Sequence, residues 1–333
     1  MAPANIDPND LLSSAQGIDV IGDIHGHLAP LERLLLELGY DRMSGIWRHS
    51  EGRKALFLGD LVDRGPSNMG VVQTVRSMVE AGEAVCLMGN HELNAVHFSM
   101  EDPQVPGRHL RARSDKNIGQ HVAFLREYHA GPEARDRMRK DLAWFASLPL
   151  WIELPGLRAV HACWSQAHID RLADPLVLAG PDRSDVWQEA ADTGRPLGEA
   201  VDVILKGAEI KLPDNVSFED KDGHVRKEAR LKWWSEGSSW RDAVIGTAPL
   251  YDAIAHLEGS PDSALSYGDD EKPVFFSHYW MSARNGAPEL TRSPNVCCLD
   301  YSVARPGGLL AAYRWDGEET LSSERLMWAK GTI

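Results

Sequence analysis

Three short strings in the first hundred residues combine metal-binding side chains with glycine. They read Gly-Asp-Ile-His-Gly at 22–26, Gly-Asp-Leu-Val-Asp-Arg-Gly at 59–65 and Gly-Asn-His-Glu at 89–92. Carboxylate and amide oxygens mixed with imidazole nitrogens suit manganese, iron or zinc better than calcium or copper. A single Gly-Asp pair usually marks only a turn. Three such strings, about thirty residues apart, instead predict one shared metal site.

Each string follows a short apolar run that predicts a buried strand. The runs are Ile18–Ile21, Ala55–Leu58 and Ala84–Met88. Between the first two runs, leucines recur at the spacing of one helix face, at Leu31, Leu34, Leu35 and Leu38. Right-handed strand–helix–strand crossovers bring the carboxyl ends of parallel strands to one edge of a sheet, which is where ligand sites lie. The sequence therefore predicts that the three strings meet there.

Together, the three strings resemble the phosphoprotein-phosphatase branch of the calcineurin-like metallophosphoesterases, in its bacterial form. The resemblance is specific over residues 17–100 and looser over 155–165 and 273–316. It implies an α/β fold in which two mixed β-sheets form a sandwich flanked by helices, with metals at one edge. We expect residues 1–333 to form a single metallophosphoesterase domain, with an insertion or cap at about 165–250.

The resemblance also implies a site for two divalent metal ions, with manganese expected and iron or zinc as the other choices. The implied ligands are Asp23, His25 and Asp60 for one ion, and Asp60, Asn90, His161 and His278 for the other. Two ions about 3.5–4 Å apart lower the pKa of a bridging water and neutralise charge on the phosphoryl group. For His161 and His278, the alternative is a buried histidine with a structural role.

Three further residues are predicted to take part in catalysis. His91 is placed to protonate the leaving oxygen, because its neighbour Asn90 faces the metals. Asp63 would orient His91 and raise its pKa. Arg64 offers a planar fork of donors that matches phosphate oxygens. Other histidines are expected at the surface or in supporting positions: His27, His97, His109, His121 and His168.

One position departs from the family pattern. Many eukaryotic members carry an arginine just before the Gly-Asn-His string, where this chain has Met88. Phosphate would then be held by Arg64 and the metals alone, or by a basic residue from elsewhere. Arg108, Arg111 and Arg113 could supply that contact. Solvated loop charges are an equally good interpretation of these three arginines.

The expected insertion carries a cluster of basic and aromatic residues. Arg226 and Arg230 precede Trp233 and Trp234. The arginines could belong to a lid that grips a phosphorylated substrate. Alternatively, the segment is a cap whose tryptophans pack into the core, and we favour packing because buried tryptophan contributes a large apolar area.

Composition narrows the possible partners. The chain has 333 residues, with 35 basic and 49 acidic side chains and a net charge of −14. Such a surface argues against non-specific binding of nucleic acid or of an anionic membrane, which requires a positive field. The first sixteen residues do not show a basic segment followed by an apolar one, and no stretch approaches a membrane span. We therefore expect a cytoplasmic protein.

These features predict a metal-dependent phosphoester hydrolase in which hydroxide attacks phosphorus directly. The expected substrate is phosphoserine, phosphothreonine or phosphotyrosine in a protein, or a small phosphomonoester. The main alternative is a nucleotide hydrolase similar to the symmetrical diadenosine-tetraphosphate hydrolases, whose motifs are nearly the same. A non-catalytic binding module is a more distant alternative. It would require a missing ligand or acid, and the motifs in this chain are intact.

Overall fold

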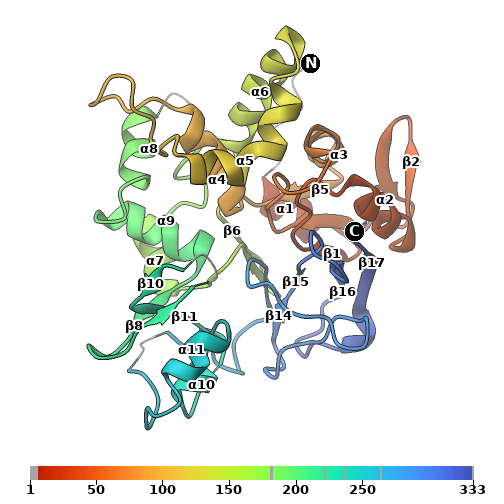
Figure 1. Cartoon of the computed structure of the whole chain (residues 1–333). Coiled ribbons are helices and arrows are strands. Elements are labelled where there is room, and N and C mark those ends of the chain that lie inside the picture. Colours follow the sequence, from red (N-terminus) through yellow and green to blue (C-terminus); the bar gives the residue numbers. More distant parts are fainter. Residues whose placement is uncertain (1–6, 181–182, 221–222, 236, 263–264, 332–333) are drawn as a thin grey trace.

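The computed structural model describes residues 7–180, 183–220, 223–235, 237–262 and 265–331 (Figure 1). Six strands form the larger sheet, in the order β15–β16–β1–β4–β5 with β17 beside β16. They are β1 (Ile18–Ile21), β4 (Lys54–Phe57), β5 (Ala84–Cys86), β15 (Asp300–Tyr301), β16 (Leu309–Trp315) and β17 (Leu326–Lys330). Strands β1, β4 and β5 are parallel. Their carboxyl ends therefore share one edge, as predicted.

Four strands form the second sheet, in the order β14–β13–β7–β6. They are β6 (Trp151–Glu153), β7 (Arg158–Val160), β13 (Val274–Phe276) and β14 (Val296–Cys298). Strands β7, β13 and β14 are parallel, whereas β6 is antiparallel to β7. Both sheets are thus mixed, and each contains three parallel strands.

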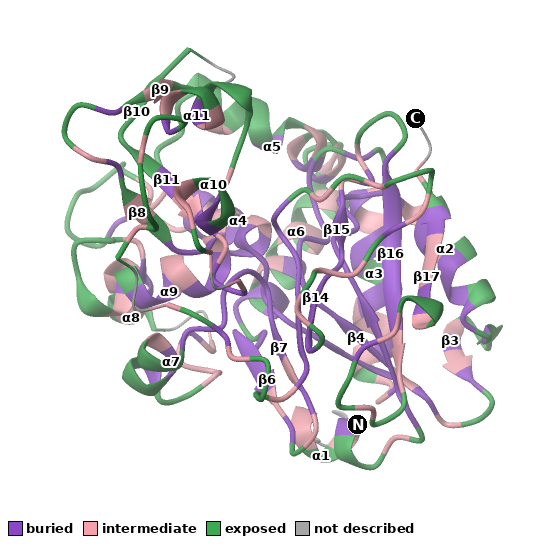
Figure 2. Cartoon of the chain, turned by 90° about the horizontal axis from the view of Figure 1, so that it is seen from below, coloured by how far each residue is buried: buried purple, intermediate pink, exposed green. Residues whose placement is uncertain are grey.

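The two sheets pack face to face around an apolar layer that is buried from solvent (Figure 2). This layer includes Val20, Leu56 and Val85 from the larger sheet and Ile152, Ala159 and Phe275 from the smaller one. Strand residues that point away from this layer, such as Phe57 and Phe276, belong to a second apolar cluster shared with the helices. The predicted α/β sandwich of two mixed sheets flanked by helices is confirmed.

Helices flank the sandwich (Figure 1). They are α1 (Pro8–Ser13), α2 (Leu28–Glu37), α3 (Asn68–Glu80), α4 (Asn90–Ser99), α5 (Asp115–Tyr128), α6 (Pro132–Phe145), α7 (Gln166–Leu172), α8 (Ser184–Ala190), α9 (Pro196–Lys206), α10 (Trp240–Ala243), α11 (Ala248–Ala253) and the short 3₁₀ helix Ser323–Arg325. Helix α2 packs against β16 and β17, and α3 packs against β5. The four leucines predicted to form one helix face are all buried in the core. Within the described residues, no helix combines the length and apolar character needed to cross a bilayer.

The carboxyl-terminal strands agree with the sequence-based expectation only in part. The apolar runs 296–301 and 309–315 predict a hairpin. Residues 300–301 (β15) do pair antiparallel with β16, but residues 296–298 form β14 in the smaller sheet. A continuous apolar run fits a buried position in either sheet, so the pattern alone does not reveal the crossing. Strand β17 and the hairpin of β2 (Tyr40–Met43) with β3 (Ile46–His49) were not predicted either.

The expected insertion contains small sheets of its own. Strands β8 (Glu209–Lys211), β11 (Glu228–Leu231) and β12 (Val244–Ile245) form one sheet, and β9 (Phe218–Glu219) pairs with β10 (Val225–Arg226). A separate apolar cluster lies under them: Leu212, Val216, Ala229, Val244, Leu250 and Ile254. Small apolar clusters of this kind typically stabilise long chain segments that lie outside the main core. We propose that this segment is an insertion within a single domain.

Two tryptophans join this segment to the main core. Trp233 and Trp234 are only 1% and 5% exposed. Their ring centroids lie 4.8 and 4.7 Å from that of Phe276. The Trp233 Nε1 group donates a hydrogen bond to the carbonyl oxygen of Ala162, over 3.0 Å. The tryptophans therefore pack into the core, which is the interpretation that the sequence favours.

Removing the Trp233 side chain should destabilise the fold. We expect Trp233→Ala to lower the free energy of unfolding by about 3–5 kcal/mol, because a buried cavity replaces the ring. Denaturant titration measures this change. The control Val225→Ala, at a side chain that is 63% exposed, should change it by less than about 0.5 kcal/mol. Equal denaturation midpoints for Trp233→Ala and the wild type would contradict the packing role.

Candidate metal centre and active site

Both sheets deliver polar side chains to one edge of the sandwich. These are Asp23 and His25 after β1, Asp60 after β4, Asn90 after β5, His161 after β7 and His278 after β13. None of the six is more than 8% exposed. The parallel strands of the two sheets end side by side, so residues from five strands meet at one place. The structure thus brings all six predicted metal ligands together.

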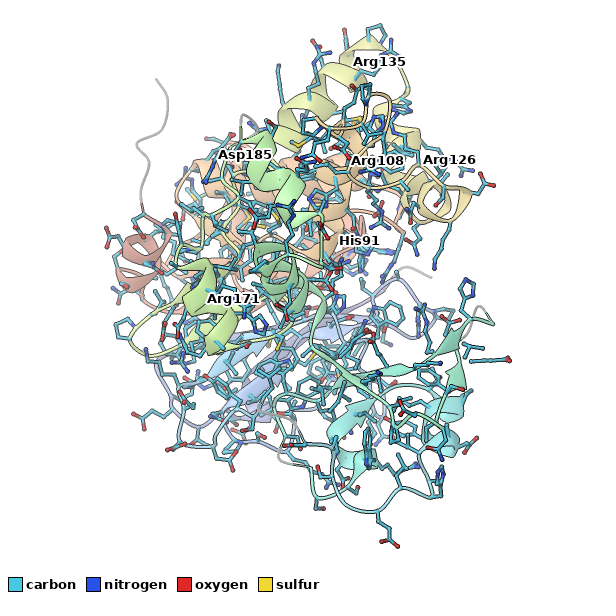
Figure 3. The ribbon with its side chains drawn as sticks, turned by 90° about the vertical axis from the view of Figure 1, so that its left-hand side faces the viewer. His91, Arg108, Arg126, Arg135, Arg171 and Asp185 are labelled. Atoms are coloured by element: carbon cyan, nitrogen blue, oxygen red, sulfur yellow. The ribbon has the colours of Figure 1, made fainter. Side chains whose placement is uncertain are left out.

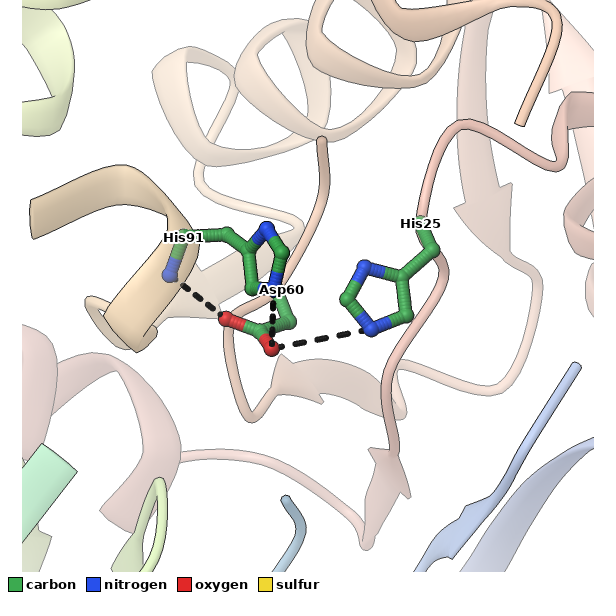
Figure 4. A group of neighbouring side chains, drawn as sticks. All are labelled: His25, Asp60 and His91. Carbon is green, nitrogen blue, oxygen red and sulfur yellow. Dashed lines mark hydrogen bonds and ion pairs between the residues drawn. The ribbon is translucent and has the colours of Figure 1, made fainter. Parts of the chain in front are cut away.

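Asp60 lies at the centre of this group (Figure 4). Its Oδ2 atom is 3.6 Å from Nε2 of His25 and 3.9 Å from Nε2 of His91. Its Oδ1 atom is 3.4 Å from Nε2 of His161. Two sets of side chains are close enough to hold a metal ion: His25, Asp60 and His91, and Asp60, His161 and His278. Because Asp60 belongs to both sets, its two oxygens can serve two neighbouring ions.

The amide of Asn90 joins the second set. Its Oδ1 atom is 3.1 Å from Nε2 of His161 and 2.8 Å from Nδ1 of His278. Asp23 lies beside the first set, with Oδ2 3.8 Å from Nε2 of His25. The implied division of the ligands into two groups that share Asp60 is therefore compatible with the geometry.

Several of these ligand atoms are buried without a hydrogen-bond partner among the described residues. They include both carboxylate oxygens of Asp23, Nε2 of His25 and Nε2 of His278. A buried polar atom without a partner costs free energy. Two cations, one at each group of ligands, would satisfy them. The donor set therefore fits divalent metal ions on chemical grounds.

Backbone carbonyls fix the orientation of two imidazoles. Nδ1 of His25 lies 2.9 Å from the carbonyl oxygen of Val62, and Nδ1 of His161 lies 2.7 Å from that of Leu58. A carbonyl only accepts, so each Nδ1 carries the proton and donates it. Each Nε2 is left as a lone-pair donor for a metal, which is the usual arrangement of metal-binding histidine.

Burial controls the charge of these groups. Burial, reinforced by Asp300 and Asp60, raises the pKa of Asp23 well above its usual value. Burial also lowers the pKa of His25 and of His278 well below the usual imidazole value. Neutral imidazole is the form that binds metal. A nearby cation favours the ionised carboxylate, so metal binding would lower the pKa of Asp23.

The backbone of the site is strained. His25, Asp60, Asp63, Arg64 and His278 all have positive φ, between 45° and 76°. Such conformations cost about 1–3 kcal/mol each for residues other than glycine and cluster at functional sites. In a regular strand, successive side chains point to opposite faces. The positive φ values allow nearby side chains of these loops to point toward the same site instead.

Glu92 ties two of these loops together. Its carboxylate accepts hydrogen bonds from the backbone N–H groups of Asp60, Leu61 and Gly89, over 2.8–3.0 Å. Burial, reinforced by Asp60, raises the pKa of Glu92 to about 7. No role was predicted for this residue. Its position three residues after the N-cap of α4 is that of the acidic residue in a helix capping box, which is a recognisable sequence signal.

Asp63 connects two histidines. Its Oδ2 atom is 2.5 Å from Nδ1 of His91, and its Oδ1 atom is 2.6 Å from Nδ1 of His121. Burial alone would raise the pKa of Asp63, but the hydrogen bonds from His121 and His91 outweigh it and lower that pKa. Burial lowers the pKa of His91, but Asp60 and Asp63 outweigh burial and raise it. Asp63 is therefore ionised, as orienting His91 requires.

Of the five histidines expected at the surface or in supporting positions, His121 lies in the site. It comes from α5, and its ring stacks on that of Phe124 with centroids 4.4 Å apart. His97 is buried against Trp187 instead. Nothing in the local sequence of α5 marks His121, because its partner Asp63 lies 58 residues earlier.

A cleft of about 540 Å³ opens in front of the site. Its lining includes Asp63, Arg64, Asn90, His91 and His278 from the site, and Arg111, His121, Trp280 and Arg305 from elsewhere. Nη2 of Arg64 is 3.4 Å from Nε2 of His91. The predicted phosphate-binding arginine and the predicted acid thus face the same cleft.

The arginines proposed as further substrate contacts lie in different places. Arg111 lines the cleft. Arg108 is exposed and paired with Asp102, and Arg113 packs its guanidinium 5.1 Å from the Phe98 ring centroid. Neither of these two is among the residues that line the cleft.

The two arginines of the insertion also differ from each other. Arg226 pairs with Asp220 in the β9–β10 hairpin. Arg230 lies 5.4 Å from the ring centroid of Tyr279, and its charge contributes to the lowered pKa of His278 after burial itself. Arg230 is therefore near the metal ligands, but neither arginine lines the cleft.

Comparison with known proteins identifies the family. The family model for calcineurin-like phosphoesterases matches residues 17–278. The bis(5'-nucleosyl)-tetraphosphatase PrpE (asymmetrical) of Geobacillus sp. (strain WCH70) is 32% identical over 187 residues, covering 54% of this chain and 70% of that protein. The protein of the same name from Oceanobacillus iheyensis is 29% identical over 186 residues, with 54% and 69% covered.

The fold agrees with this relationship. A protein serine/threonine phosphatase from Saccharomyces cerevisiae has 16% identity and a TM-score of 0.50, covering 96% of this chain and 82% of that one. At this identity the likeness shows the fold alone. The chain belongs to the calcineurin-like phosphoesterase family. It is a metal-dependent hydrolase of phosphoric esters.

The bridging position of Asp60 can be tested by counting metal ions. After reconstitution with manganese, the wild type should hold about two ions per chain, and Asp60→Asn should lose at least one, because an amide has only one oxygen. Elemental analysis after dialysis measures this number. His109→Asn, at a half-buried histidine outside the cleft, should retain both. Two tightly bound ions in Asp60→Asn would contradict bridging.

The role of His121 can be separated from simple packing. His121→Phe should keep the ring stacking but lose the hydrogen bond to Asp63, and so slow hydrolysis of an alkyl phosphate by about tenfold. His121→Gln keeps a donor and should lose less. The effect should shrink for nitrophenyl phosphate, whose leaving group needs little protonation. Equal rate losses for both esters would indicate a structural role only.

Proposed function

We propose that the chain hydrolyses phosphorylated proteins (at serine, threonine or tyrosine) and small phosphomonoesters, using two divalent ions with manganese preferred. The observation that carries this proposal is the position of Asp60, whose oxygens lie near His25 on one side and near His161 on the other, with the hydrogen-bonded pair of His91 and Asp63 beside it. A bimetal hydrolase requires that combination of a shared ligand and a placed acid.

The six ligands divide into two groups that share Asp60 in this proposal. Asp23, His25 and Asp60 would hold one ion, and Asp60, Asn90, His161 and His278 would hold the other. When bound, the ions lower the pKa of a water molecule toward neutrality and neutralise the charge of the phosphoryl oxygens. Carboxylate and amide oxygens with imidazole nitrogens support manganese over calcium.

The remaining residues handle the substrate and the proton. Arg64 binds phosphoryl oxygens through its guanidinium. His91 donates a proton from Nε2 to the leaving oxygen, while Asp63 holds Nδ1 and stabilises the charged form of the ring. Because Nη2 of Arg64 lies 3.4 Å from Nε2 of His91, a phosphate bound by Arg64 also lies beside the acid.

A nucleotide hydrolase is the second candidate. The PrpE relatives are named bis(5'-nucleosyl)-tetraphosphatases, and the cleft is large enough for a ligand of nucleotide size. Bimetal chemistry serves an ester and an anhydride equally well. Assays of one preparation on a phosphopeptide and on a dinucleoside tetraphosphate would separate the two candidates.

The proposed acid gives the sharpest test of the mechanism. Chelation should abolish hydrolysis of an aryl phosphate, and manganese should restore it. His91→Asn should retain both ions yet turn over about 10²–10⁴-fold more slowly, which is the usual contribution of a general acid. The loss should be smaller for nitrophenyl than for alkyl esters. Near-normal rates for both esters would exclude His91 as the acid, and full activity after exhaustive chelation would exclude the metals.

A further inference from the structure

We propose that Arg305, Trp280 and Arg111 form a second anion subsite, which binds a phosphate group next to the one that is hydrolysed. A substrate with a second phosphate group beside the reacting one would then bind more tightly than a single phosphoester. A dinucleoside polyphosphate, the second candidate above, is a substrate of this kind. This inference rests on the proposed hydrolysis at the metal site and names residues that would add to substrate binding there.

The charge of the cleft is the first argument. Its lining contains the guanidinium groups of Arg64, Arg111 and Arg305 but only one carboxylate, that of Asp63. Both oxygens of Asp63 are already hydrogen-bonded to histidines. Across the described part of the chain, none of the three arginines forms an ion pair. In a chain of net charge −14, such a cleft concentrates positive field where an anion can enter.

Trp280 connects Arg305 with Arg64, the arginine proposed to bind the reacting phosphoryl group. The guanidinium carbon of Arg305 is 4.8 Å from the centroid of the Trp280 ring, and that of Arg64 is 5.3 Å from it. A ring face attracts a cation without neutralising it. Both arginines therefore contact one indole at the cleft and keep their positive charge.

The loops that carry Trp280 and Arg305 are fixed in place. The buried carboxylate of Asp300 accepts hydrogen bonds from the backbone N–H groups of Trp280, over 2.8 Å, and of Ser302, over 2.9 Å. Trp280 and Ser302 have φ of 52° and 56°, a conformation that side-chain-bearing residues rarely adopt. The backbone N–H of Arg305 in turn donates to the carbonyl of Ser302, over 2.8 Å. The fold thus maintains strained turns that present the subsite.

Neutral side chains orient Arg111, so its positive charge remains available to bind an anion. Its Nη2 atom donates to Oε1 of Gln120, over 2.8 Å, and to Oδ1 of Asn117, over 3.2 Å. Both acceptors are neutral amides from α5, and both line the cleft. They orient the guanidinium without cancelling its charge. Its planar fork of N–H donors can therefore bind phosphate oxygens.

The cleft has room for a second phosphate group beside the one that is hydrolysed. About 540 Å³ lies within the range of sites that enclose whole small molecules, whereas Arg64 and the metals already account for one phosphoryl group. In the reaction, one water adds across a P–O–P link. A bond forms from the water oxygen to phosphorus, the bridging P–O bond breaks, and the bridging oxygen leaves with the remaining phosphates.

The test compares substrates in wild type, Arg305→Gln and Arg305→Lys. Arg305→Gln should lower the ratio of kcat/KM for the dinucleotide to that for nitrophenyl phosphate by about tenfold, mainly through KM. Arg305→Lys should recover part of the loss. Arg126→Gln, an exposed arginine on α5 outside the cleft (Figure 3), is the matched control and should leave the ratio unchanged.

Binding provides a readout that does not require turnover. Inorganic tripolyphosphate, titrated by calorimetry, should bind Arg305→Gln about tenfold more weakly than the wild type. An unchanged substrate ratio together with unchanged tripolyphosphate affinity would overturn the subsite while leaving the metal hydrolase intact. If no substrate is hydrolysed with manganese, the proposed function fails, and the calorimetric comparison still decides the subsite.

Discussion

A single buried carboxylate, that of Glu92, holds the loops after β4 and β5 in the relative position that the site requires. It accepts hydrogen bonds from Asp60 and Leu61 in one loop and from Gly89 in the other. Without it, three buried N–H groups would have no partner, at a cost of about 1–3 kcal/mol each. Asp60 belongs to the first loop, and Asn90 and His91 follow Gly89. The geometry of metal ligands and acid therefore depends on this one side chain.

The same edge of the sandwich concentrates negative charge away from water. Asp23, Asp60 and Asp300 are each at most 3% exposed, and burial is the largest factor that raises the pKa of Asp23 and of Asp300. Burying carboxylates without counter-charges is costly. Divalent cations would offset that cost, so a site of this composition couples metal binding to the stability of the fold. Bound cations would stabilise the strained loops as well.

The sequence predicted those parts of the site that are encoded locally. An apolar run followed by Gly-Asp or Gly-Asn defines both a strand and its polar end, so Asp23, Asp60 and Asn90 could be placed on one edge from residue order alone. His121 and Arg305 could not, because they reach the cleft from a helix and a loop without periodic patterns. The apolar run 296–301 fits either sheet equally well, and only tertiary packing divides it between them.

The parts of the site that the sequence predicts and the parts that it does not predict also differ in function. Strand ends from both sheets supply the proposed metal ligands, and a centre of two metal ions can serve either a phosphoester or a phosphoanhydride. Discrimination between substrates must therefore come from the loops and helices around the cleft, including the turns after β13 and β15 and the start of α5. The curated relatives align over only 54% of this chain. A substrate inferred from shared motifs alone thus leaves out the residues that select it.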